Sequence, residues 1–179
     1  LLVDNGLKAP LAVISNGVEI KKFELSGRDN LCSRKNILLY FGRVDFDKKI
    51  DVLIRAASLI RSNFEIWIAG GGGAMAYLKT LVKKLGLDEK IKFLGRVPER
   101  KKAEIYHRAK IFVMPSTAEA QSIVSLEAAA AGLPLILADF GALPELIDSS
   151  HKNGVVFRPD DPGDLAVKID TLLSKPKLL

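Results

Sequence analysis

The segment that decides the fold of this chain is residues 111–127, IFVMPSTAEAQSIVSLE. Its four opening residues are apolar and predict a buried strand, which Pro115 ends. Residues 123–131 predict a helix, and Ser122 is a suitable N-cap because its hydroxyl can accept a hydrogen bond from an orphan backbone N–H. A strand, a turn and a helix in this order form the repeating unit of a parallel sheet.

Two carboxylates in this segment indicate a binding site. Glu119 follows the strand, and Glu127 lies in the expected helix eight residues later. Between them, the amides of Ile123, Val124 and Ser125 lie at a helix start, where anions bind well. A nucleotide-sugar carries matching groups, namely a ribose, a diphosphate and a hexose. The alternative interpretation is that Glu119 is a loop charge and Glu127 a solvated helix charge.

The composition is typical of a soluble globular domain. The 179 residues are 48% apolar and 27% charged, and the net charge of +6 favours polyanionic ligands without selecting one. The single cysteine, Cys32, excludes an internal disulfide and indicates a reducing compartment, and two histidines without paired cysteines argue against a zinc site. The sequence has no signal-peptide pattern at its start and no apolar stretch long enough to span a bilayer, so we expect a cytoplasmic location.

Apolar strands and amphipathic helices alternate along the chain. Strands are expected at 37–41, 64–69, 91–94, 111–114, 135–138 and 155–157, and helices at 48–61, 74–85, 99–109, 123–131, 142–147 and 162–174. This alternation indicates an α/β fold with a Rossmann-like, doubly wound parallel sheet of six strands, covered on both faces. The expected strand order is 3-2-1-4-5-6, which places a ligand outside the carboxyl ends of strands 37–41 and 111–114.

Two basic residues follow the first expected strand. Arg43 comes directly after it, and Lys48 begins the next helix. Both would project over the crevice that residues 115–127 also line, where a guanidinium fork and an ammonium can neutralise a diphosphate. The alternative is that both are exposed basic residues of a connecting loop.

Four consecutive glycines, residues 70–73, follow the second expected strand. Such glycines could belong to a dinucleotide-binding oxidoreductase, in which they let the backbone approach a pyrophosphate. However, the run does not follow the first strand, and strand 91–94 is followed by Gly95 and Arg96 rather than by a ribose-binding acidic residue. We instead interpret the run as a flexible loop near the ligand.

A basic cluster, Arg96, Arg100, Lys101 and Lys102, follows the third expected strand. It could face a nucleotide or form a solvated helix face. A nucleic-acid site would need aromatic residues among these charges, and only Tyr106 lies at the edge of the cluster, so no nucleic-acid partner is expected.

Taken together, these motifs resemble the C-terminal, nucleotide-sugar-binding domain of the retaining glycosyltransferases of family 4, which have the GT-B fold. The matching segments are a linker motif at 14–18, Gly42–Arg43 with Lys48, Ala69–Gly70 with Gly72, residues 93–95, Pro115–Ser116, Glu119 and Glu127 as the family's E-x7-E motif, residues 132–134, and Gly141 with Pro144–Glu145. An isolated E-x7-E motif is a weak signal, whereas this ordered set is specific and extends over nearly the whole chain.

The resemblance implies roles at the matching positions. Arg43 and Lys48 would stabilise the departing nucleoside diphosphate without a metal ion, and Glu119 would contact the transferred sugar. Glu127 would hold the ribose hydroxyls. The expected donor-binding residues are, in chain order, Gly42, Gly72, Val97, Lys102, Ser122, Ile123, Val124 and Glu127. In this set the amides near Ile123 and Val124 would meet the phosphates, and Val97 and Lys102 would lie beside the base.

The resemblance also implies a domain organisation. Residues 1–35 would be the end of an interdomain linker with a lead-in segment, and residues 36–179 the nucleotide-sugar-binding domain. We expect a fragment that lacks an N-terminal acceptor-binding domain and is inactive alone. One departure lies inside the E-x7-E motif, where Ala-Gln-Ser at 120–122 replaces the Gly-Phe-Gly or Pro-Phe-Gly that is frequent in the family.

The function that these observations favour is donor binding in a retaining glycosyltransferase, which moves a hexose from a UDP-, GDP- or ADP-sugar to a glycan or lipid acceptor. Two alternatives stay open: a dinucleotide-binding oxidoreductase domain, and a non-catalytic nucleotide- or polyanion-binding module. Peripheral contact with an anionic membrane is a further expectation. It rests on five lysines that are close in sequence, Lys79, Lys83, Lys84, Lys90 and Lys92.

Overall fold

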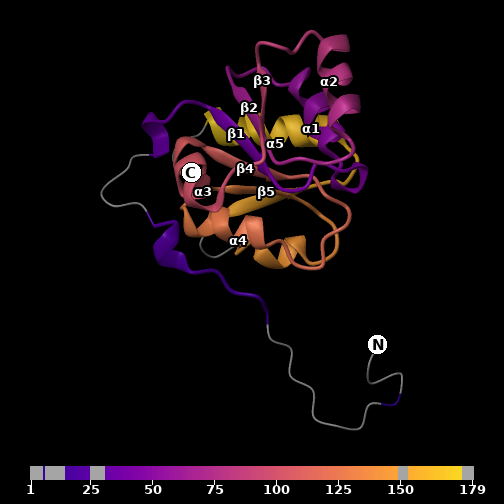
Figure 1. Ribbon diagram of the computed structural model, residues 1–179. Coiled ribbons are helices and arrows are strands. Elements are labelled where there is room, and N and C mark those ends of the chain that lie inside the picture. Colours follow the sequence, from indigo (N-terminus) through magenta and orange to yellow (C-terminus); the bar gives the residue numbers. More distant parts are fainter. Residues whose placement is uncertain (1–5, 7–14, 25–30, 149–152, 175–179) are drawn as a thin grey trace.

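The computed structural model describes residues 6, 15–24, 31–148 and 153–174, and Figure 1 shows their arrangement. Its centre is a six-stranded sheet in which all neighbouring strands are parallel and the order is β3-β2-β1-β4-β5-β6. The strands are β1 (Ile37–Phe41), β2 (Glu65–Ala69), β3 (Ile91–Gly95), β4 (Ile111–Met114), β5 (Leu135–Ala138) and β6 (Gly154–Phe157). The predicted doubly wound sheet and its strand order are therefore confirmed.

Helices cover both faces of the sheet (Figure 1). One layer consists of α1 (Ile50–Ala57), α2 (Met75–Lys84) and α5 (Pro162–Ser174), and α1 contacts both of the others. The opposite layer contains α3 (Lys102–Arg108) and α4 (Ile123–Ala130). Because both faces are covered, every residue of β1, β4 and β5 is buried, which explains why these strands are apolar throughout.

Three predicted helices differ from the structure. The helix expected at 99–109 begins with a 3-10 turn, Glu99–Lys101, and continues as α3. The helix expected at 48–61 is divided into a 3-10 turn at Phe46–Lys48 and α1, which begins at Ile50. Lys49 separates them with a left-handed backbone, φ +51°, that neither helix can contain. The segment expected at 142–147 is a 3-10 helix, Leu143–Leu146, in which Pro144 has no N–H to donate.

The lead-in segment is attached to the sheet domain. Its 3-10 turn, Ile20–Lys22, is followed by Phe23, which is buried against Tyr106 of α3 with ring centroids 5.7 Å apart. His107 of α3 lies with its Nε2 2.8 Å from the carbonyl oxygen of Phe23. Ile14 of the predicted linker motif lies outside the described residues.

The glycine run packs against the loop that follows β1. A Cβ at Gly70 would lie 1.7 Å from the carbonyl oxygen of Gly42, and a Cβ at Gly72 would lie 2.4 Å from that of Val44. The amide of Val44 also donates to the carbonyl of Gly71 at 3.0 Å. These glycines therefore allow two backbones to approach each other, which corrects the interpretation of the run as a flexible loop.

The sheet opens where the strand order reverses. The register between β1 and β2 extends over five pairs, from Ile37–Glu65 to Phe41–Ala69, whereas β1 and β4 pair only at Leu38–Ile111 and Leu39–Phe112. The ends of β1 and β4 therefore lead into separate loops, 42–48 and 115–122, at the switch point of the sheet.

The close approach of Gly70 to Gly42 predicts a large effect of a single methyl group. Gly70→Ala should lower the free energy of unfolding by about 3 kcal/mol, because it adds both a clash and a backbone strain at φ +137°. Denaturant unfolding followed by circular dichroism would measure this loss.

Gly86→Ala is the matched control, since Gly86 also has a positive φ, +66°, but has open space where its Cβ would lie. Strain alone should cost about 1 kcal/mol there. Equal losses in the two variants would contradict the packing of the two loops.

Candidate functional site

The loop after β1 gathers two cations around one carboxylate. The guanidinium of Arg43 contacts Asp45 and lies 3.3 Å from Asp47. The ammonium of Lys48 lies 3.5 Å from the same Asp47 oxygen. Arg43 and Lys48, which sequence analysis paired as a phosphate clamp, are thus brought together through Asp47. The Arg43 side chain is 66% exposed and can reach solvent, where a ligand would lie.

Lys48 joins this loop to the loop after β4. Its Nζ donates to the Glu119 carboxylate at 2.9 Å and to the carbonyl of Ala118 at 2.8 Å. The Lys48 and Glu119 side chains are only 9% and 15% exposed. A cation buried to this degree needs such partners, because burial removes most of its hydration.

The start of α4 lies between the two carboxylates of the E-x7-E motif. Ser122 occupies the predicted N-cap position but its side chain caps no backbone amide; instead the Ser125 hydroxyl donates to the Ser122 hydroxyl at 2.8 Å. The Ser125 amide donates to the Ser122 carbonyl. Among the hydrogen bonds of the described residues, none uses the amides of Ile123 and Val124, so these two remain donors for an anion.

Gln121, which belongs to the departure from the family motif, accepts a hydrogen bond from the amide of Asn16 at 2.7 Å. The lead-in segment therefore contacts the loop that carries Glu119. Sequence analysis noted Gln121 as a substitution and did not foresee this contact.

Glu127 is buried and bonded to protein groups through both of its oxygens. Lys102 of α3 lies 2.9 Å from Oε1 and 3.3 Å from Oε2, and the Tyr106 hydroxyl donates to Oε2 at 2.9 Å. Lys102 also pairs with the exposed Glu99 at 3.1 Å. The alternative interpretation of Glu127 as a solvated helix charge is therefore wrong, since its side chain is only 7% exposed.

The surroundings of Glu127 set the protonation of its partners. Burial lowers the pKa of Lys102, but hydrogen bonds to Glu127 and Glu99 outweigh it and hold the pKa above its usual value. Burial, followed by the charge of Glu127, raises the pKa of Tyr106 well above its usual range. Lys102 is therefore charged, and Tyr106 carries its proton, throughout the physiological pH range.

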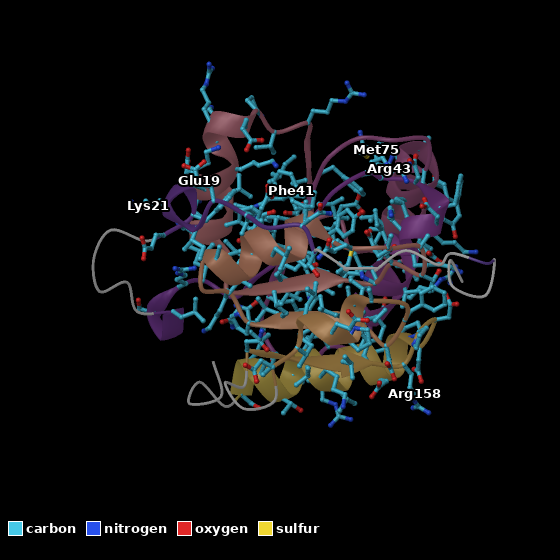
Figure 2. The ribbon with its side chains drawn as sticks, turned by 90° about the horizontal axis from the view of Figure 1, so that it is seen from below. Glu19, Lys21, Phe41, Arg43, Met75 and Arg158 are labelled. Atoms are coloured by element: carbon cyan, nitrogen blue, oxygen red, sulfur yellow. The ribbon has the colours of Figure 1, made fainter. Side chains whose placement is uncertain are left out.

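The remaining predicted residues lie around the same edge of the sheet. Val97 is half-buried against the core in the connection between β3 and α3. Lys102, the first residue of α3, places its ammonium 5.6 Å from the centroid of the Phe41 ring. Gly42 begins the 42–48 loop and Gly72 packs against it, so both shape the loop through backbone contacts. In the view of Figure 2, Glu19 and Lys21 of the lead-in segment lie on one side of Phe41, and Arg43 lies on the other.

Several residues of the site were not foreseen from the sequence. Asp45 and Asp47 lie two and four positions after Arg43, a spacing that could have indicated their pairing with it. Tyr40 and Tyr106 are both fully buried, and a buried tyrosine needs a partner for its hydroxyl. Tyr40 donates to the Arg43 carbonyl and Tyr106 to Glu127, and no sequence signal identifies either partner.

The arrangement can bind a molecule with an anionic middle and hydroxyl groups at both ends. Cations and free amides lie around the start of α4, with one carboxylate on either side. Within the described ranges, no group of three or more His, Cys, Asp or Glu side chains is placed to hold a metal ion.

The five lysines of the predicted membrane contact lie on α2 and along the edge of β3. Lys79 and Lys83 line a groove of about 430 Å³ with Phe93. No helix in the described part of the chain is long and apolar enough to cross a membrane. Contact with an anionic membrane stays a prediction.

Comparisons with known proteins identify the family of the chain. The family model described as glycosyl transferases group 1 matches residues 22–179. The chain is 36% identical over 174 residues to an uncharacterized glycosyltransferase of Methanocaldococcus jannaschii, covering 90% of this chain and 44% of that protein. It is 30% identical over 171 residues to glycogen synthase of Mycobacterium tuberculosis, covering 94% and 41%. The chain thus spans less than half the length of these curated relatives.

Solved structures share the fold. Anabaena HepE in complex with UDP matches with a TM-score of 0.82 at 24% identity, over 93% of this chain and 49% of that one, and a complex of HepE with UDP-glucose matches equally. The catalytic domain of cholesterol-alpha-glucosyltransferase from Helicobacter pylori matches with a TM-score of 0.71 at 26% identity, over 79% and 88%. The Rossmann-like sheet expected for one half of a GT-B fold is confirmed.

The buried pair between Lys48 and Glu119 predicts a loss of stability when the cation is removed. Lys48→Met retains the apolar stem and leaves Glu119 without its charged partner, so the free energy of unfolding should fall by about 3 kcal/mol. Chemical denaturation at neutral pH would measure it.

The neighbouring Lys49→Met serves as the control. Lys49 pairs at 3.0 Å with Asp160, which is 57% exposed, so its removal should cost about 0.5 kcal/mol. A Lys48→Met variant as stable as Lys49→Met would show that the buried pair contributes nothing to stability.

Proposed function

The chain belongs to the glycosyl transferases of group 1, and we propose that it forms the donor-binding half of a retaining member. Its ligand would be a nucleoside-diphosphate sugar, from which a hexose is transferred with its α-configuration kept. The observation that carries this proposal is the arrangement of cations, carboxylates and free backbone amides at the switch point of the sheet. Arg43 and Lys48 are followed by Glu119, the free amides at the start of α4, and Glu127 with Lys102.

The proposed binding mode follows from the charges of these groups. The diphosphate would lie over the amides of Ile123 and Val124, where the positive end of the α4 dipole favours an anion. Glu119 would accept hydrogen bonds from the hexose and Glu127 from the ribose. The base would then lie towards Val97 and Lys102, at the connection between β3 and α3.

The proposed catalytic contribution is stabilisation of the leaving group. As the bond to the sugar breaks, negative charge develops on the diphosphate, and the two cations of the 42–48 loop can neutralise it. Arg43 would have to exchange Asp45 and Asp47 for phosphate oxygens. This exchange is favourable where phosphate offers a bidentate partner to the guanidinium fork. No metal ion is required for this step.

The relatives support this proposal over the alternatives. The names of those compared above include a glycogen synthase and a cholesterol-alpha-glucosyltransferase, which fits a retaining hexosyl transfer to a glycan or a lipid. The family match favours a glycosyltransferase over a dinucleotide-binding oxidoreductase. A non-catalytic nucleotide-binding module remains the competing function, and a sugar-specific contact would distinguish it.

Calorimetry with UDP, GDP, ADP and NAD would test the diphosphate site. We expect one nucleoside diphosphate to bind with a dissociation constant of roughly 1 μM to 1 mM, or about −8 to −4 kcal/mol. Arg43→Ala should weaken it by about 1.5–3 kcal/mol and leave the corresponding nucleoside unaffected. Asp47→Asn should strengthen it about threefold, because the variant removes the carboxylate that competes for both cations.

Equal losses for the nucleoside and the diphosphate in Arg43→Ala would show that the phosphates lie elsewhere. Tight binding of NAD without binding of any nucleoside diphosphate would favour the oxidoreductase.

The sugar contact can be tested with Glu119→Gln. The nucleotide that binds most tightly in calorimetry would be compared with its glucose, galactose and mannose conjugates. In the wild type, one conjugate should bind about tenfold more tightly than the nucleotide alone, and Glu119→Gln should abolish that advantage. A conjugate advantage that survives in Glu119→Gln would exclude Glu119 from the sugar site, and no advantage for any conjugate in the wild type would favour the non-catalytic module.

A further inference from the structure

Tyr106 lies next to the proposed ribose site and is enclosed by three aromatic rings. It is fully buried, and its ring stacks on Phe41 with centroids 5.4 Å apart. Phe23 meets it edge-on at 5.7 Å, and Phe112 lies at 6.2 Å. Aromatic rings enclosed in this way have one orientation, so the hydroxyl is directed to one place.

The hydroxyl has one proton and two acceptors within reach. Glu127 Oε2 lies at 2.9 Å and the carbonyl of Val124 at 3.2 Å. A carboxylate is the stronger acceptor, and the distance to it is shorter, so the proton points to Glu127. Because burial raises the pKa of Tyr106 well above its usual range, this proton is present at every physiological pH.

Counting acceptor positions shows what Glu127 has left to offer. An ionised carboxylate has about four lone-pair sites, two on each oxygen. Lys102 takes one on Oε1 and, at 3.3 Å, one on Oε2, and Tyr106 takes the other on Oε2, which leaves one free site, on Oε1. This site can accept a hydrogen bond from a ribose hydroxyl.

Lys102 competes for the same oxygen. Its ammonium already lies 3.3 Å from Oε2, beyond the short contact that it makes with Oε1. Without the Tyr106 hydroxyl, a rotation of the carboxylate would give Lys102 both oxygens at short distance. The free site on Oε1 would then turn away from its present direction, although Glu127 itself would be unchanged.

We infer that Tyr106 is a positioning residue for ribose recognition: its hydroxyl holds Glu127 Oε2 so that the free acceptor site on Oε1 keeps one direction. This inference rests on the proposed function, in which Glu127 binds the ribose. It adds a residue that touches no ligand and acts only through Glu127.

The test is the preference for ribonucleotides over 2′-deoxyribonucleotides. UDP, GDP and ADP and their 2′-deoxy counterparts would be titrated into the wild-type chain and into Tyr106→Phe. The wild type should prefer the ribo form of its best ligand by about tenfold, and Tyr106→Phe should reduce the preference to about twofold. Competition by inorganic pyrophosphate should be equal in both proteins, which shows that the phosphate site of the variant is intact.

Tyr40→Phe is the matched control, because Tyr40 is equally buried and donates to the Arg43 carbonyl at 2.5 Å. Tyr40→Phe also loses a buried hydroxyl, but one that contacts the 42–48 loop. This variant should therefore keep the preference for ribonucleotides, even if its binding of pyrophosphate changes. A general loss of packing would instead lower the ribonucleotide preference in both variants. The melting temperatures of the two variants would therefore be measured as well.

The outcomes separate this inference from the function on which it rests. If the wild type does not distinguish ribo from deoxy ligands, the assignment of Glu127 to the ribose is wrong and the inference is overturned with it. If the wild type distinguishes them and Tyr106→Phe keeps the full preference, only the inference is overturned. An equal reduction in Tyr40→Phe would also overturn it.

Discussion

The buried ammonium of Lys48 is the interaction on which the arrangement of the site depends. The sheet places the ends of β1 and β4 side by side, but the loops that follow are 71 positions apart in sequence at Lys48 and Glu119. Lys48 cannot be buried without charged and polar partners, and both of its close partners belong to the second loop. On its other side, the first loop is held by the backbone of the glycine run. Two fixed neighbours therefore give the 42–48 loop one conformation.

Every cation of the site has a carboxylate partner before any ligand binds. Arg43 contacts Asp45 and Asp47, Lys48 contacts Glu119, and Lys102 contacts Glu127. Binding of an anion is therefore an exchange of partners, and only the difference between the old and new contacts contributes to affinity. The pairs also hold the side chains in place, which reduces the entropy that a ligand must overcome. Modest affinity and a well-defined binding geometry follow from the same contacts.

The sequence predicts the fold more completely than the site. Continuous apolar strands and the order of the motifs are sufficient for the six-stranded sheet and its switch point, because covered parallel strands leave a strong local pattern. Local patterns also place Glu119, Glu127 and the start of α4 correctly. They do not reveal the left-handed Lys49 or the hydroxyl pair of Ser122 and Ser125, since these depend on what packs around them. The pairing of Glu127 with Tyr106 joins residues 21 positions apart, and no spacing rule covers it.

The location of buried polar groups gives an independent argument that function shaped this edge of the sheet. Within the described residues, the buried polar or charged side chains are Lys48, Lys110, Ser116, Ser122, Ser125 and Glu127. All except Lys110 belong to the 42–48 loop or to the 115–127 segment. Lys110 directly precedes β4 and bonds to Asn36, which directly precedes β1, so it lies at the amino ends of the strands, opposite the site. Replacing a buried ion pair with apolar residues of similar volume is often neutral or stabilising, so stability alone gives no reason to keep charges here. A fold that is otherwise consistent departs from apolar packing mainly where it performs a function. In this chain that place is the switch point, where the topology of the sheet also predicts the ligand.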